Sequence, residues 1–154
     1  MLLIYDPNKG PKSAWCGDQG PILGGFLDYL QVHPKDPVAQ SLPGEIMNGV
    51  FSPWMVNAQK VVLPTTEAMS GTDPDDYNCG SGVFWRYLLG GFCQKGALHD
   101  DVLSYAKADP ENNAIYKSAE DACQGNSPGD ELFKPFNALA TLLAAIEILS
   151  EVSQ

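Results

Sequence analysis

The segment 135–150 constrains the fold more than any other part of the chain. It is rich in alanine and leucine, and its apolar residues occupy nearly every side of a helix until Glu147 and Glu151. A helix with this pattern is buried on most of its sides, so other helices must surround it. A chain of 154 residues is long enough to supply them and to bury a sizeable core. We therefore expect an all-α fold in which residues 1–154 form a single helical domain.

Further segments show the apolar spacing of helices, for a total of five or six. They are 21–32, 36–51, 82–95 and 109–123, with a short helical piece at 100–107. Pro43 and Gly44 predict a kink or a break in the second segment. Asp109 followed by Pro110 predicts a helix start with the aspartate as N-cap. Residues 52–80 have no helical period and predict a long irregular loop. Loops of this length within a compact domain usually have a function.

Glycines lie in pairs inside two of the predicted helices. Gly24 and Gly25 belong to the first pair, and Gly90 and Gly91 to the second. Each costs about 1 kcal/mol relative to alanine in a helix interior. We therefore expect a neighbouring helix to approach closely at these positions, as in helical hairpins packed in layers.

Composition excludes several classes of partner. The net charge is −10, with 9 basic residues in all, whereas nucleic acids and anionic membranes are bound by clustered lysine and arginine. The most apolar window, 138–149, is shorter than the roughly 20 residues of a membrane span, so we expect none. The first residues lack the charged start and long apolar region of a secretion signal. The chain is therefore either cytoplasmic or a piece of something longer.

The four cysteines indicate neither a metal site nor a redox pair. Cys16, Cys79, Cys93 and Cys123 are widely spaced and contain no C-x-x-C pair. Two disulfides are one interpretation, and four small buried thiols are the favoured one, because a helical domain of this size does not need cross-links. No G-x-S-x-G motif and no glycine-rich phosphate loop with a lysine occurs. We expect no metal and no cofactor.

The stretch 15–27 carries the first candidate site. Trp15, Asp18 and Gln19 precede Pro21, which suits the first position of a helix. In one interpretation Asp18 or Gln19 is a plain N-cap that accepts hydrogen bonds from the first-turn amides. In the other, the three side chains form a sugar site, because such sites combine a flat aromatic ring with short polar groups that bind hydroxyls. Both interpretations stay open.

A second candidate lies in the helix predicted at 82–95. Arg86 is flanked by Phe84, Trp85 and Tyr87, so we expect it to pair with a carboxylate or to stack on a ring. The consecutive aspartates at 75–76 invite a catalytic interpretation, but clusters of this kind are ordinary turn chemistry.

Two motifs resemble those of a known family. The sequence GVFWRYL at 82–88, preceded by Cys79 and an acidic loop, resembles the G-I-F-x-R-x-L segment of glycoside hydrolase family 76, the α-1,6-mannanase-like (α/α)6 barrels. The sequence WCGDQG at 15–20, followed by ILG, is similar to the aromatic, N/D-Q-G, apolar-G segment that opens another inner helix in those barrels. The resemblance covers essentially the whole chain through short motifs. It implies a partial barrel of about three helical hairpins out of six, the C-terminal half.

The resemblance implies a carbohydrate-active domain that hydrolyses or binds α-linked mannan-like glycans, outside the cell or in its envelope. Asp18 is then the candidate catalytic carboxylate. The candidate substrate-binding residues are Trp15, Gln19, Phe84, Trp85 and Arg86. The family's catalytic aspartate pair lies upstream of the aromatic element, where this chain has no counterpart, and its lysine before G-I-F is replaced by Ser81. Whether the chain is an enzyme therefore stays open, and the alternative is a non-catalytic glycan-binding or helical protein-interaction module.

A half barrel also leaves an apolar flank uncovered, and a large exposed apolar patch marks an interface. Either the rest of the barrel belongs to a longer chain, or a partner chain or a second copy of this chain covers the flank.

Overall fold

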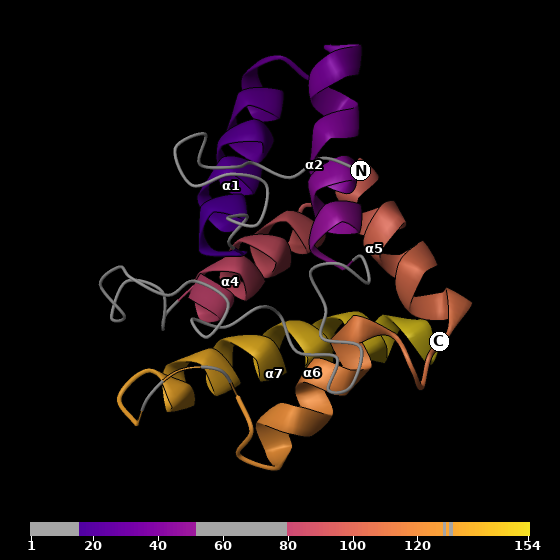
Figure 1. Ribbon diagram of the computed structural model, residues 1–154. Coiled ribbons are helices and arrows are strands. Elements are labelled where there is room, and N and C mark those ends of the chain that lie inside the picture. Colours follow the sequence, from indigo (N-terminus) through magenta and orange to yellow (C-terminus); the bar gives the residue numbers. More distant parts are fainter. Residues whose placement is uncertain (1–15, 52–79, 128, 130) are drawn as a thin grey trace.

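A computed structural model describes residues 16–51, 80–127, 129 and 131–154. Within these ranges the chain forms helices and turns with no strand, so the all-α prediction is confirmed (Figure 1). The helices are α1 (Cys16–Val32), α2 (Pro37–Val50), α4 (Gly80–Cys93), α5 (Ala97–Ala108), α6 (Ala114–Cys123) and α7 (Lys134–Val152). The long loop predicted at 52–80 lies outside the described residues, apart from Gly80, which begins α4.

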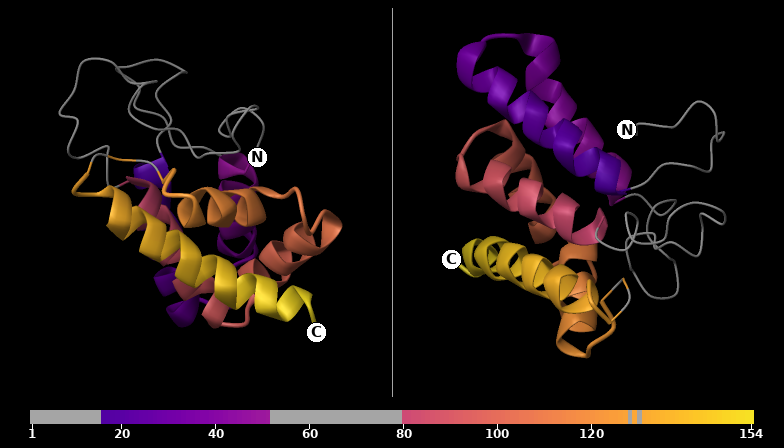
Figure 2. Two further views of the ribbon diagram at one scale, coloured as in Figure 1. Left: turned by 90° about the horizontal axis from the view of Figure 1, so that it is seen from below. Right: turned by 90° about the vertical axis from the view of Figure 1, so that its left-hand side faces the viewer.

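Three helices form a row at the centre of the molecule. α1 packs against α4, and α4 packs against α7 on its other side. The right-hand view of Figure 2 shows that all three begin on the same side of the molecule. The remaining helices return the chain between them: α2 packs on α1 and α5, α5 packs on α4 and α7, and α6 packs on α7. Polar and aromatic residues at the starts of α1 and α4 are thereby carried to one side.

The core is centred on α4. Its Phe84, Trp85, Leu88 and Phe92 side chains are almost completely buried. They belong to one continuous apolar cluster that contains residues of all six helices in the described part of the chain. Burying a side chain of this size contributes roughly 1.5–3 kcal/mol, so α4 is the element that the other helices are packed around.

Two of the four predicted glycine contacts are present. A β-carbon at Gly24 would lie 2.4 Å from the Tyr87 ring, and one at Gly91 would lie 2.6 Å from the side chains of Leu27 and Leu98. Gly25 and Gly90 have no neighbouring atom within 4 Å of that position, so the prediction is wrong for them.

The first helix begins five residues earlier than predicted. α1 starts at Cys16, so Pro21 lies inside the helix and Asp18 lies in its first turn rather than at an N-cap. A proline at this point removes a single hydrogen bond, the one to the carbonyl of Gly17. Pro43 likewise lies inside an unbroken α2, which Asp36 caps by accepting hydrogen bonds from Val38 and Ala39.

The N-cap predicted at Asp109 is also wrong. α6 begins at Ala114, and Asn113 caps it by accepting a 2.9 Å hydrogen bond from the amide of Tyr116. The Asn113 side-chain amide donates to the carbonyls of Ala106 and Asp109, at the end of α5. An aspartate has no N–H with which to make those second contacts, so the asparagine is the better residue between the two helices.

α7 differs from the prediction in its exposure. It was expected to be buried on most sides, but four large apolar side chains on one face are exposed. They are Phe136 at 64%, Leu139 at 57%, Leu143 at 51% and Ile146 at 66%. The opposite face, which includes Ala144, Ala145 and Ile148, is buried against the other helices. We call the exposed set the α7 stripe.

Candidate functional site

The start of α1 is pressed against the first turns of α4. A β-carbon added at Gly20 would lie 3.0 Å from the α-carbon of Phe84, so only glycine allows this approach without a shift of backbone. Asp18 is exposed in the first turn of α1, whereas Gln19, the next residue, is fully buried. Trp15, the aromatic member of the predicted sugar site, lies outside the described residues.

The candidate residues of α4 separate into two groups. Phe84 and Trp85 are 0% and 1% exposed, and their rings pack against Phe51 and against each other at centroid distances of 5.8–5.9 Å. In these positions the two rings belong to the hydrophobic core and do not present a face to solvent. Arg86 is exposed, and its guanidinium lies 5.5 Å from the centre of the Tyr87 ring. Of the two partners predicted for Arg86, a carboxylate or an aromatic ring, the structure shows the ring.

A buried asparagine holds the start of α4 against α7. The Asn137 side-chain oxygen accepts a 2.9 Å hydrogen bond from the amide of Gly82, and the Asn137 side chain is almost fully buried. A β-carbon at Gly82 would lie 2.5 Å from that oxygen, so a larger residue would break the contact. The glycine of the GVFWRYL motif thus sets the position of Arg86 relative to α7.

Beside this contact, α4 and α7 enclose a groove of about 340 Å³. Its lining consists of Gly82, Val83, Arg86 and Leu89 from α4, and Phe136, Asn137, Leu139, Ala140 and Leu143 from α7. Among the described residues that line the groove, Arg86 is the single charged one. The groove is not predicted by the sequence motifs. The available signal was the 3-4-3 spacing of the α7 stripe, which was interpreted as core.

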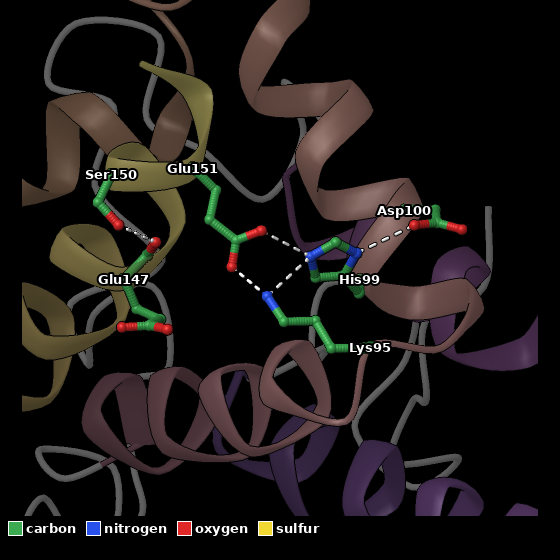
Figure 3. A network of polar contacts seen from close by, with 6 residues as sticks. All are labelled: Lys95, His99, Asp100, Glu147, Ser150 and Glu151. Atoms are coloured by element: carbon green, nitrogen blue, oxygen red, sulfur yellow. Dashed lines mark hydrogen bonds and ion pairs between the residues drawn. The ribbon is translucent and has the colours of Figure 1, made fainter. Parts of the chain in front are cut away.

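A polar network lies at the other end of α4 and α7 (Figure 3). The His99 ring nitrogens lie 3.0 Å from Asp100 Oδ1 and 3.0 Å from Glu151 Oε2, and Lys95 forms an ion pair with Glu151. Hydrogen bonds to Asp100 and then to Glu151 raise the pKa of His99, and hydrogen bonds from Lys95 and then His99 lower the pKa of Glu151. Because both ring nitrogens are engaged, the network is suited to holding α7 against α5 rather than to transferring protons.

The part of the chain that the structure describes contains no cluster of metal-binding side chains. No group of three or more His, Cys, Asp or Glu side chains gathers there in a way that could hold an ion. Cys93 and Cys123 are free and exposed, so the prediction of buried thiols is wrong for these two. Cys79 lies outside the described ranges.

α7 bears on the predicted absence of a membrane span. Among the described helices it alone is long and apolar enough to cross a membrane by length and composition, with 19 residues. About 28% of its most apolar window is buried inside the molecule. The core helix of a soluble protein can have the same length and apolar composition. The absence of a membrane span therefore stays a prediction.

The structure places the described candidate residues on two neighbouring helices. Asp18 on α1 and Arg86 on α4 are exposed, whereas Gln19, Phe84 and Trp85 are buried. Comparison of the chain with protein-family models, with curated proteins and with solved structures found no match.

Proposed function

We propose that this chain is a carbohydrate-active domain that hydrolyses or binds α-linked mannan-like glycans. In this proposal it is part of a barrel of the (α/α)6 type and resembles glycoside hydrolase family 76. The supporting observation is the row of α1, α4 and α7, whose N-terminal ends lie on one side with Asp18 and Arg86 exposed on adjacent helices. A row of parallel helices connected by returning helices is the arrangement expected of stacked hairpins.

Asp18 is the carboxylate that this proposal uses. A glycosidase needs two carboxyl groups across the scissile bond, one that protonates the leaving oxygen and one that acts as nucleophile or base. In this proposal Arg86 binds sugar hydroxyls and Trp15 stacks on a sugar ring. Gln19, Phe84 and Trp85 are buried and stabilise the packing of α1 and α4.

The test is incubation with α-1,6-mannan and with a panel of plant and microbial glycans. Wild type is compared with Asp18→Asn, and Asp28→Asn serves as a matched control because Asp28 is also exposed on α1. We expect Asp18→Asn to reduce the release of reducing sugar at least a hundredfold, as loss of an essential general acid does, and the control to retain it. Release that survives in Asp18→Asn removes Asp18 from the mechanism.

Binding without release in the wild type would assign the chain to non-catalytic glycan recognition. Neither binding nor release from any glycan of the panel would reject the carbohydrate proposal as a whole.

A second candidate function is a helical protein-interaction module. It is favoured by the α7 stripe and by the apolar groove beside it, because the largest exposed apolar patch of a protein is often a site of interaction. An environment-sensitive apolar dye tests it: the dye should bind wild type and lose most of its binding in Leu143→Glu. Equal binding to both proteins would argue against this function.

A further inference from the structure

The α7 stripe has the spacing of a coiled-coil seam. Phe136, Leu139, Leu143 and Ile146 follow one another at intervals of three, four and three residues, which are the a and d positions of a heptad. They lie on the face opposite the buried side of α7, so a second helix can approach them without displacing the core. The geometry of this face is therefore that of one half of a helix pair.

The spacing is also symmetric about its middle, near Thr141. If a second α7 runs in the opposite direction, Phe136 of one copy meets Ile146 of the other, and Leu139 meets Leu143. Each of the four side chains is then paired with an apolar side chain of the other copy, and the same patch serves both copies. That is the requirement for a two-fold symmetric dimer.

The charges at the two ends of α7 favour the antiparallel direction. Lys134 is at the N-terminal end, Glu147 is near the C-terminal end, and no charged residue lies between 135 and 146. Glu151 is already bound by Lys95 and His99, and Figure 3 shows the Glu147 carboxylate outside that network. An antiparallel pair brings the N-terminal end of each α7, which carries Lys134, to the Glu147 end of the other copy and opposes the helix dipoles, whereas a parallel pair places like ends together.

The exposed area suits a weak dimer. At roughly 200 Å² for each such side chain when fully exposed, the stripe exposes on the order of 500 Å² per copy. A standard interface buries about 800 Å² per partner, so the stripe supplies more than half and the half-buried Val83 and Leu89 of the groove extend it. The charge of −10 on each copy opposes association, and this opposition weakens with added salt.

From these observations we propose that the occupant of the α7 stripe is a second copy of this chain, bound by an antiparallel α7–α7 pair. This inference rests on the second proposed function, a protein-interaction module, and is independent of the glycan proposal. It identifies the partner as the chain itself and assigns both the symmetry and the residue pairing of the interface.

The test is sedimentation analysis of the full chain over a wide range of protein and salt concentrations. We expect a monomer–dimer equilibrium that shifts toward dimer as salt is added. Leu143→Glu should weaken dimerisation more than tenfold, because it places an unpaired carboxylate in the centre of the seam. Val38→Glu is the matched control, an exposed apolar side chain on α2, and should leave the equilibrium unchanged.

Charge reversal tests the direction of the pair. Lys134→Glu and Glu147→Lys should each weaken the dimer about two- to fivefold, because like charges then lie at both ends of the symmetric interface, at distances where they are partly screened. The double variant restores complementary charges and should dimerise more tightly than either single variant. Circular dichroism and urea unfolding confirm that each variant is folded, which is expected because the substituted side chains are exposed.

Four results would overturn the proposal. A dimer that persists in Leu143→Glu places the interface elsewhere, and charge reversals without recovery in the double variant reject the antiparallel direction. A wild type that is monomeric at every concentration and salt rejects the second copy. If the monomeric wild type binds the dye and Leu143→Glu does not, the chain is still an interaction module, but its partner is another molecule. If wild type and Leu143→Glu bind the dye equally, the interaction function is rejected as well. A monomer that binds phosphatidylcholine vesicles through Leu143 identifies the occupant as a lipid surface instead.

Discussion

Replacing Gly20 by alanine measures how closely α1 approaches α4. The new β-carbon would lie 3.0 Å from the Phe84 α-carbon, 3.1 Å from the Phe84 nitrogen and 3.1 Å from the Val83 carbonyl oxygen. All three are backbone atoms of α4, so no side chain can rotate away to make room. Gly25 is the matched control on the same helix, because it is exposed and has no neighbouring atom within 4 Å of a β-carbon.

The two substitutions should change the free energy of unfolding in opposite directions. Alanine is favoured over glycine in a helix interior by about 0.8–1.0 kcal/mol, and Gly25→Ala should gain most of this. Gly20→Ala gains little of this amount, because Gly20 precedes Pro21 and a β-carbon there crowds the proline ring in a helical backbone. It also forces the two helices apart, and overpacking of this kind costs about 1–3 kcal/mol. We therefore expect a net loss of about 1–3 kcal/mol, and a difference of roughly 2–4 kcal/mol between the two variants.

Urea unfolding followed by circular dichroism measures both values, with the slope of the transition checked for a constant extent of unfolding. Gly20→Ala should also alter glycan binding if Asp18 and Arg86 share a site, because it shifts α1 relative to α4. If Gly20→Ala stabilises the protein as much as Gly25→Ala does, α1 and α4 are not in close contact at this point, and the placement of Asp18 beside α4 loses its support.

Two further outcomes follow from the described residues. Asn113→Ala should lower the free energy of unfolding by about 1–2 kcal/mol through loss of the α6 cap, while Asp109→Ala should change it by less than about 0.5 kcal/mol in the same urea titration. Because hydrogen bonds to Asp100 and Glu151 raise the pKa of His99 above its ordinary value of 6.5, the stability that it contributes is complete below about pH 6.5 and is lost as the pH rises through the folded-state pKa. Urea titrations across this range should show a decline that His99→Gln removes, and an equal decline in the variant would contradict the assignment.

The candidate site was predictable only at the level of its segments. Residues 16–20 of the first motif and the motif at 82–88 do lie on neighbouring helices, and the contact of Arg86 with the Tyr87 ring is between adjacent residues in one helix. The depth of each side chain was not predictable in the same way. Phe84 and Trp85 are aromatic residues of the type that stacks on sugar rings. Which side of α4 is exposed to solvent, however, depends on where Phe51 and the other helices pack.

Helix boundaries show a similar dependence on distant residues. Asp109-Pro110 has the local pattern of a helix start, yet α6 begins at Ala114, because Asn113 also binds carbonyls at the end of α5. The spacing of apolar residues located each helix, since a helix period is a property of a short stretch of chain. The final position of a cap was decided by contacts between two helices.

The sequence by itself determined the all-α class and the approximate extent of the helices, because the 3.6-residue period and the proline and glycine signals act locally. It also indicated that α7 is apolar on nearly all sides. Only the tertiary structure decided which of those sides is covered: Ala144, Ala145 and Ile148 are buried, and the α7 stripe is exposed. The physical reason is that periodicity assigns residues to the faces of one helix, whereas burial depends on which neighbouring helices reach each face.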